Sequence, residues 1–129
     1  MDINWIGIGA ATVSAFVLGG IWYGPLFGKK WQALVGLSDD QVKNANMAKI
    51  FGGAFVLTFI AAFVFAMFLG PDITIGQGTA YGASAGLCWV AASFGINYLF
   101  AQKPFALLLI DGGYATSMFT LFGLLLGAL

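Results

Sequence analysis

The chain has 129 residues, of which 60% are hydrophobic and 8% are charged. A soluble domain carries about 25% charged residues, so this chain has too few polar groups to cover its surface in water. Five lysines balance five aspartates, and His, Glu and Arg are absent, which excludes a basic nucleic-acid surface and most catalytic and metal sites.

Four apolar segments follow one another along the chain, and they predict an all-α membrane protein built as a bundle of four transmembrane helices. We expect a single transmembrane domain over residues 1–129, with spans at about 4–27, 47–70, 74–100 and 104–127. Each segment reaches the ~20 residues that cross the hydrocarbon core. Each should be helical, because lipid offers no partner for an unpaired backbone group.

The first connection is the only long one, and it holds most of the charge. Within it, Ser38 and Gln41 have the spacing of a capping box, which predicts a helix that begins at Asp39. This helix forms a short cytoplasmic extension before the second span. The sequence allows it to continue unbroken through Lys49 or to bend at the membrane surface.

The other two connections are short. Gly70-Pro71-Asp72 predicts a tight turn, and Pro104 suits the first turn of the fourth helix. The lysines lie in or beside the first and third connections, at positions 29, 30, 43, 49 and 103. The positive-inside rule therefore places these connections in the cytoplasm and both termini on the outer side of a bacterial inner membrane. Residues 1–5 carry no positive charge, so we expect no cleaved signal peptide.

Small residues recur at four-residue spacing in every span, which favours close helix packing in lipid. The stripes are Gly7, Ala11, Ala15 and Gly19; Ala54, Thr58, Ala62, Ala66 and Gly70; Gly78, Gly82 and Gly86; and Gly112, Thr116, Gly123 and Gly127. They do not say whether the partner helix belongs to the same chain or to another copy. Because so small a chain can hardly enclose a pathway alone, we expect a homo-oligomer, most simply a two-fold dimer.

A weak internal echo links the ends of the first and third spans. Gly20-Ile21-Trp22-Tyr23 precedes Leu26-Phe27, and Gly95-Ile96-Asn97-Tyr98 precedes Leu99-Phe100. Two helix pairs related by a parallel repeat would produce this pattern. Chance similarity in a biased composition would produce it as well.

Asp111 is the only acidic residue inside a predicted span. A charge at the centre of the bilayer costs ~2.5–3.5 kcal/mol on insertion scales, so such residues usually face the protein interior. Asp111 lies eight positions after Lys103, which places it ~12 Å from the cytoplasmic surface at ~1.5 Å per residue. Asn97, on the preceding helix, should reach a similar depth, where a hydrogen bond between the two side chains is within reach. The same level holds four aromatic residues, Trp22, Tyr23, Tyr98 and Tyr114.

Two interpretations of this cluster remain open. In the functional one, Asp111 binds a proton, a cation or a small polar ligand, and Asn97 and the tyrosines orient it. In the structural one, Asp111 fixes the third helix to the fourth, and Trp22, Tyr23 and Tyr98 belong to an interfacial aromatic belt. Hydroxyls farther along the fourth helix should bond back to their own helix, so no polar path across the membrane is evident.

Several short motifs occur in the order typical of one bacterial membrane family. They are Asn4-Trp5, the segment Trp22-Tyr23-Gly24-Pro25-Leu26-Phe27-Gly28 with Trp31 after it, Asn97-Tyr98-Leu99-Phe100, and Leu109-Ile110-Asp111-Gly112-Gly113-Tyr114. The chain resembles the family catalogued as domain of unknown function 1761 over nearly its whole length. The resemblance implies a small multi-pass membrane protein and brings no activity, cofactor or site residue with it.

These observations favour a small transporter or channel-like protein in which Asp111 is the ligand group for an ion or solute. The alternative is a structural or accessory membrane protein that packs against a partner through its small-residue faces. No nucleophile and base stand together in the sequence, so we do not expect an enzyme. The single cysteine, Cys88, has no second cysteine for a disulfide and no His for a shared metal, and we expect neither a metal nor a cofactor.

Overall fold

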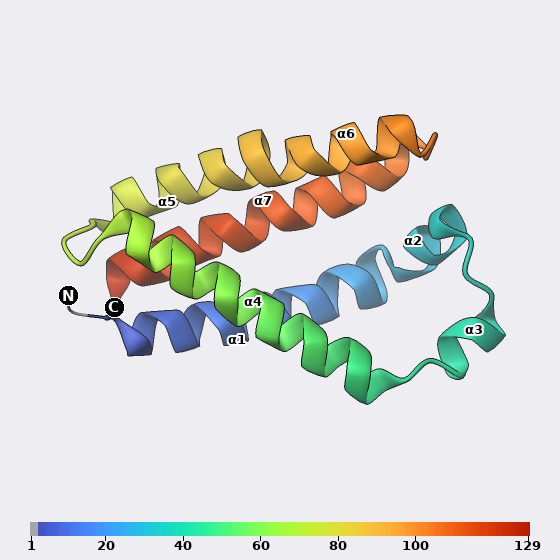
Figure 1. Ribbon diagram of the computed structural model, residues 1–129, viewed down its shortest axis with the longest axis horizontal. Helices are drawn as coiled ribbons and strands as arrows, with labels where there is room; N and C mark the ends of the chain where they lie inside the picture. Colours follow the sequence, from blue (N-terminus) through green and yellow to red (C-terminus); the bar gives the residue numbers. More distant parts are fainter. Residues whose placement is uncertain (1–2) are drawn as a thin grey trace.

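The computed structural model describes residues 3–129. The segment Met1–Asp2, which belongs to the region expected to carry no cleaved signal, lies outside the described residues. Four helices are long and apolar enough to cross a membrane, as the sequence predicted, at Trp5–Leu26, Met47–Leu69, Ile75–Phe100 and Phe105–Ala128. They lie side by side as a bundle, with shorter helices between the first two (Figure 1).

The first span consists of α1 (Trp5–Ile21) and a widened π-helical turn, η1 (Trp22–Leu26). Pro25 lies inside this turn and has no backbone N–H to continue the α-helical ladder. The amide of Phe27 instead donates to the carbonyl of Trp22, five residues back, at 2.9 Å. Such single-turn bulges occur often at functional sites, and this one carries Trp22 and Tyr23.

Two short helices form the first connection. The sequence did not predict α2 (Gly28–Val35), which ends at Gly36 in the left-handed conformation with a φ of 80°. The capping box of Ser38 and Gln41 is present and starts α3 (Asp39–Lys43), so the predicted short helix is confirmed. It is a separate helix, because the chain leaves helical geometry before Asn46 caps α4 (Met47–Leu69).

The third span runs through α5 (Ile75–Ala85), a second π-helical turn η2 (Gly86–Ala91) and α6 (Ala92–Phe100), and α7 (Phe105–Ala128) returns beside it. The first turn of α1, the last turn of α7 and the turn after α4 lie at one end of the bundle, here called the terminal end (Figure 1). The short helices α2 and α3 and the α6–α7 connection lie at the opposite end. All five lysines belong to this lysine end.

Glycines hold α5 and α7 in backbone contact, as the stripe in the third span predicted. A Cβ atom built on Gly78 would collide with the carbonyl of Gly123, and one on Gly82 would collide with the carbonyl of Phe119. At Gly86 a Cβ would lie 2.7 Å from the Cα of Thr116. Small residues thus allow the close approach that packing in lipid requires.

The hydrophobic core lies toward the terminal end. Its buried residues come from α1, α4, α5 and α7: Ile8, Ala11, Ala15, Ala62, Phe65, Ala85, Phe122 and Leu126. Only the second half of α4 joins this core, because its first half, up to about Ile60, is largely exposed. The ring of Phe55 still meets that of Phe16 in α1 at 5.5 Å between centroids, and before this contact the first half of α4 diverges from the other helices toward the lysine end (Figure 1).

Candidate functional site: a carboxylate between two tyrosines

Asp111 lies in the second turn of α7 and is 6% exposed. The hydroxyl of Tyr23, in η1, donates to its Oδ1 atom at 2.6 Å. The hydroxyl of Tyr98, in α6, donates to its Oδ2 atom. One carboxylate thus joins three separate helical segments, and both of its oxygens have a partner.

Trp22 and Tyr114 surround this centre. The indole Nε1 of Trp22 donates to the carbonyl of Ile110 at 2.9 Å, and the ring lies over Gly113, where a Cβ would come within 2.9 Å of it. The hydroxyl of Tyr114 donates to the carbonyl of Ala15 at 2.8 Å. These two bonds attach the first span to α7 on either side of Asp111.

Aromatic contacts fix the orientation of Tyr23. Its ring meets that of Tyr114 edge-on at 5.2 Å between centroids, and that of Trp31 edge-on at 5.6 Å. Both are favoured geometries for ring pairs. Trp31 lies in α2, beyond the π-helical turn, and the sequence analysis did not name it as a site residue. Its position in the family-like motif was the only signal that could have found it.

The hydrogen bond that the sequence allowed between Asn97 and Asp111 is absent from the described residues. Asn97 is exposed, and its side chain makes no hydrogen bond within residues 3–129. The next residue, Tyr98, faces α7 instead, because successive residues on a helix point about 100° apart. Counting residues from Lys103 placed Asn97 and Tyr98 near the level of Asp111, but it could not show which of the two side chains faces Asp111.

The structure therefore brings five of the six predicted site residues together and leaves Asn97 outside. It also relates the two echoed segments to each other, since Tyr23 and Tyr98 occupy matching positions in them and bind the two oxygens of one carboxylate. Farther along α7, Thr116 and Thr120 donate to carbonyls of their own helix, as predicted. Within the described residues, no three His, Cys, Asp or Glu side chains gather as a metal site would require.

A cleft of about 490 Å³ lies beside the cluster, between the first span and the first half of α4. Tyr23 and Tyr114 form part of its wall, together with Gly20, Phe51 and Thr58. Asp111 lies behind Tyr23 and does not line the cleft. Tyr23 thus separates the carboxylate from this open space.

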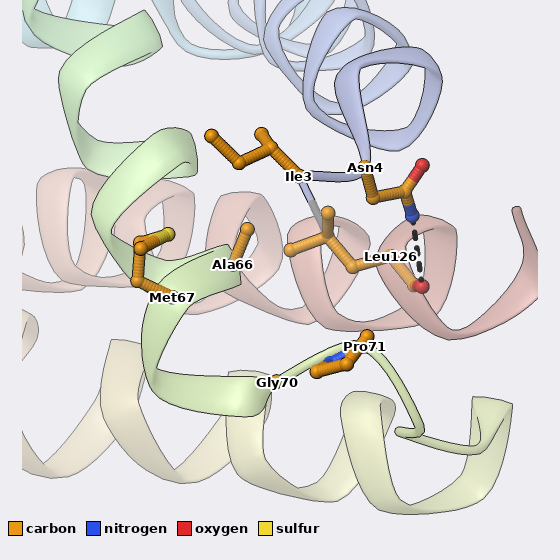
Figure 2. A pocket seen from close by; sticks show the side chains of 7 residues that line it. All are labelled: Ile3, Asn4, Ala66, Met67, Gly70, Pro71 and Leu126. Atoms are coloured by element: carbon orange, nitrogen blue, oxygen red, sulfur yellow. Dashed lines mark hydrogen bonds between the residues drawn. The ribbon is translucent and has the colours of Figure 1, made fainter. Parts of the chain in front are cut away.

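A different cavity lies at the terminal end. Figure 2 shows Ile3, Asn4, Ala66, Met67, Gly70, Pro71 and Leu126 around it, with the Asn4 side chain donating to the carbonyl of Leu126. Its volume is about 20 Å³, which holds no more than a water molecule. It is therefore no candidate for a ligand site.

The sequence model of a family described as protein of unknown function, DUF1761, matches residues 6–127. The chain belongs to this family. The match spans the whole bundle and includes every residue of the Asp111 cluster. Comparisons with curated proteins and with solved structures found no match. The family description names no activity, so a function for this member has to be argued from the cluster itself.

Proposed function

We propose that this DUF1761 protein is a small ion- or solute-transporting oligomer of the bacterial inner membrane, with Asp111 as its binding group. The observation that supports this proposal is the burial of the only acidic residue of the spans between two tyrosine hydroxyls from two other helical segments. A carboxylate at membrane depth carries a cost of ~2.5–3.5 kcal/mol, and residues with this cost commonly mark ion and solute pathways.

The chemistry of the cluster suits a proton or a hard cation. Asp111 offers two carboxylate oxygens, and each phenol of Tyr23 and Tyr98 can accept a hydrogen bond or a cation contact as well as donate. A ligand that binds a carboxylate oxygen of Asp111 would displace the hydrogen bond from one tyrosine. The phenol oxygen of that tyrosine would then be a second ligand atom beside the carboxylate. Oxygen ligands of this kind are the ones that hard cations prefer.

A flux assay tests the proposal. Protein in proteoliposomes is exposed to gradients of protons, sodium and potassium, and uptake is compared between the wild type and Asp111→Asn. Asp72→Asn is the matched control, because Asp72 is exposed in the turn at the terminal end. The proposal predicts that Asp111→Asn abolishes a flux that Asp72→Asn retains. An unchanged flux in Asp111→Asn would refute it.

The alternative function is that of a structural or accessory membrane protein, with Asp111 as an interhelical clamp. The observation that favours it is that both oxygens of Asp111 already have partners, while the hydroxyls farther along α7 bond back to their own helix. A stoichiometric, unrelated membrane protein that co-purifies with the wild type would support this function. Its absence together with a flux would exclude it.

Orientation and assembly belong to the same proposal. The lysine end faces the cytoplasm, both termini face outward, and two copies form a dimer. A reporter enzyme fused after Leu129 should be active only on the outer side, and a cytoplasmic signal would overturn the orientation. Cross-linking in native membranes should yield dimers. The proposal involves no enzyme activity, no cofactor and no nucleic acid.

A further inference from the structure

The cleft between the first span and the first half of α4 has walls without a free polar side chain. Its lining holds three hydroxyl groups, and each is already bonded: Thr58 to the carbonyl of Ala54, Tyr114 to that of Ala15, and Tyr23 to Asp111. The other lining side chains are apolar or belong to glycine. No free hydrogen-bond donor is left for an anion or a polar solute, and a hydrated cation would exchange its water for no more than hydroxyl oxygens, whereas hydrocarbon would lose nothing.

The cleft extends from the lysine end into the membrane. Its α4 wall begins at Ile50, in the first turn of that helix, and reaches Thr58, eight residues and ~12 Å deeper. Ile50 and Phe51 are about half exposed, at 50% and 57%, so the cleft is open toward the surrounding lipid. A flexible chain lying along the membrane normal fits this shape.

Lysines stand at the same end of both walls. Lys49 directly precedes Ile50, and Lys29 and Lys30 follow Gly24, the last lining residue of the first span, after a gap of four residues. All three are exposed. The whole connection from Gly28 to Lys49 contains four lysines against Asp39 and Asp40, so this connection carries a net charge of +2.

We propose that this cleft binds one acyl chain of an anionic phospholipid, whose headgroup lies against the lysines at its mouth. The apolar walls favour an acyl chain, and the lysines near the mouth favour a negatively charged headgroup. Clusters of lysine beside a transmembrane helix attract anionic lipids by roughly 1 kcal/mol per residue, which corresponds to about fivefold in affinity. The site is independent of the proposed transport, because Tyr23 lies between the two. The lipid lies on the side of Tyr23 that lines the cleft, and Asp111 lies on the side that faces α7.

Two glycines of α1 provide a matched test of the cleft. A Cβ built on Gly20 meets no atom within 4 Å, and Gly20 lines the cleft, so Gly20→Leu should fill the space without a clash. A Cβ on Gly9 is equally free, but Gly9 does not line the cleft. Gly9→Leu therefore carries the same change in helix propensity without blocking the site.

The experiment measures immobilised lipid by electron spin resonance. Protein is reconstituted in phosphatidylcholine vesicles that contain spin-labelled phosphatidylglycerol or spin-labelled phosphatidylcholine. The wild type should prefer phosphatidylglycerol, and Lys49→Gln should lower this preference about fivefold, while Lys103→Gln on the other connection leaves it unchanged. Gly20→Leu should remove one immobilised phosphatidylglycerol per chain, and Gly9→Leu should remove none.

Three results would overturn the proposal. The first is a wild type without preference for phosphatidylglycerol. The second is a preference that Gly20→Leu leaves intact, which would place the lipid on the outer surface of the bundle. The third is a change from dimer to monomer in Gly20→Leu, seen by cross-linking, which would show that a second copy of the chain fills the cleft.

Discussion

The two ends of the bundle are held together in different ways. At the terminal end, glycines bring the backbones of α5 and α7 into contact, and Phe65 and Phe122 fill a core without ionisable groups. At the lysine end, side-chain hydrogen bonds centred on Asp111 join the first span and α6 to α7, and the first half of α4 stands apart. Close packing thus holds the terminal end together, whereas polar side-chain hydrogen bonds hold the lysine end together and leave a cleft beside them.

This difference explains where a ligand site can form. A backbone contact such as that between Gly78 and Gly123 leaves no space for a ligand and no group to bind it. At the lysine end, Asp111 offers a charged group, and the cleft on the other side of Tyr23 offers a separate apolar space.

The largest effect is expected from Gly123→Leu at the terminal end. The added side chain would collide with the backbone of Gly78, so α5 and α7 must separate, and we expect a loss of about 3 kcal/mol in stability. Thermal unfolding in detergent, followed by circular dichroism, measures it. Gly76→Leu is the control, because a Cβ there meets no atom within 4 Å. Equal stability of the two variants would contradict the close packing of α5 and α7.

Asp111→Leu tests the polar junction itself. It leaves the hydroxyls of Tyr23 and Tyr98 without their acceptor, which should cost about 2 kcal/mol of the free energy of unfolding. The same unfolding measurement applies, with Asp72→Leu in the exposed turn as the control. If Asp111→Leu folds and assembles as stably as the wild type, the junction has no structural role.

The two tyrosine bonds should contribute less when they are removed singly. Tyr23→Phe and Tyr98→Phe should each lower the stability by about 0.6 kcal/mol, the mean for interhelical hydrogen bonds in a membrane protein. Neither change should have a further effect in the Asp111→Leu background, because the acceptor is already gone. Tyr81→Phe, on an exposed side chain without a hydrogen bond, provides the baseline. Additive losses in the double variants would show that the tyrosines act independently of Asp111.

The smallest effect is expected from Asn97→Ala. Because its side chain is exposed and makes no hydrogen bond within residues 3–129, stability should change by less than about 0.5 kcal/mol. The flux assay should also give the wild-type result. A loss in either measurement would return Asn97 to the site.

Hydropathy and small-residue spacing were sufficient to predict the architecture. Four long apolar segments must form four helices in lipid, because lipid offers no hydrogen-bond partner for the backbone. The glycine stripe at residues 78, 82 and 86 lies where the third span meets α7. The site was only partly predictable. Its position along the bundle, toward the lysine end, followed from counting residues from the lysines, whereas the choice of Tyr98 over Asn97 depends on the rotation of α6.

Two features of the structure could hardly be predicted from the sequence pattern. The π-helical turn at Pro25 sets the directions of Trp22 and Tyr23, and a proline alone does not say whether a helix kinks, widens or ends there. The separation of the first half of α4 was also invisible, because lipid-facing and protein-facing apolar side chains look alike in sequence. The cleft follows from this separation.

Carbon-13 nuclear magnetic resonance distinguishes an Asp111 that binds a ligand as well as joining the helices from one that only joins them. Protein labelled at the carboxyl carbon of aspartate gives five signals, and the one missing in Asp111→Asn belongs to Asp111. In lipid bilayers titrated with protons, sodium and potassium, we expect this signal to shift on addition of at least one of them. A signal that stays fixed through all three titrations would contradict ligand binding and leave Asp111 as a clamp alone.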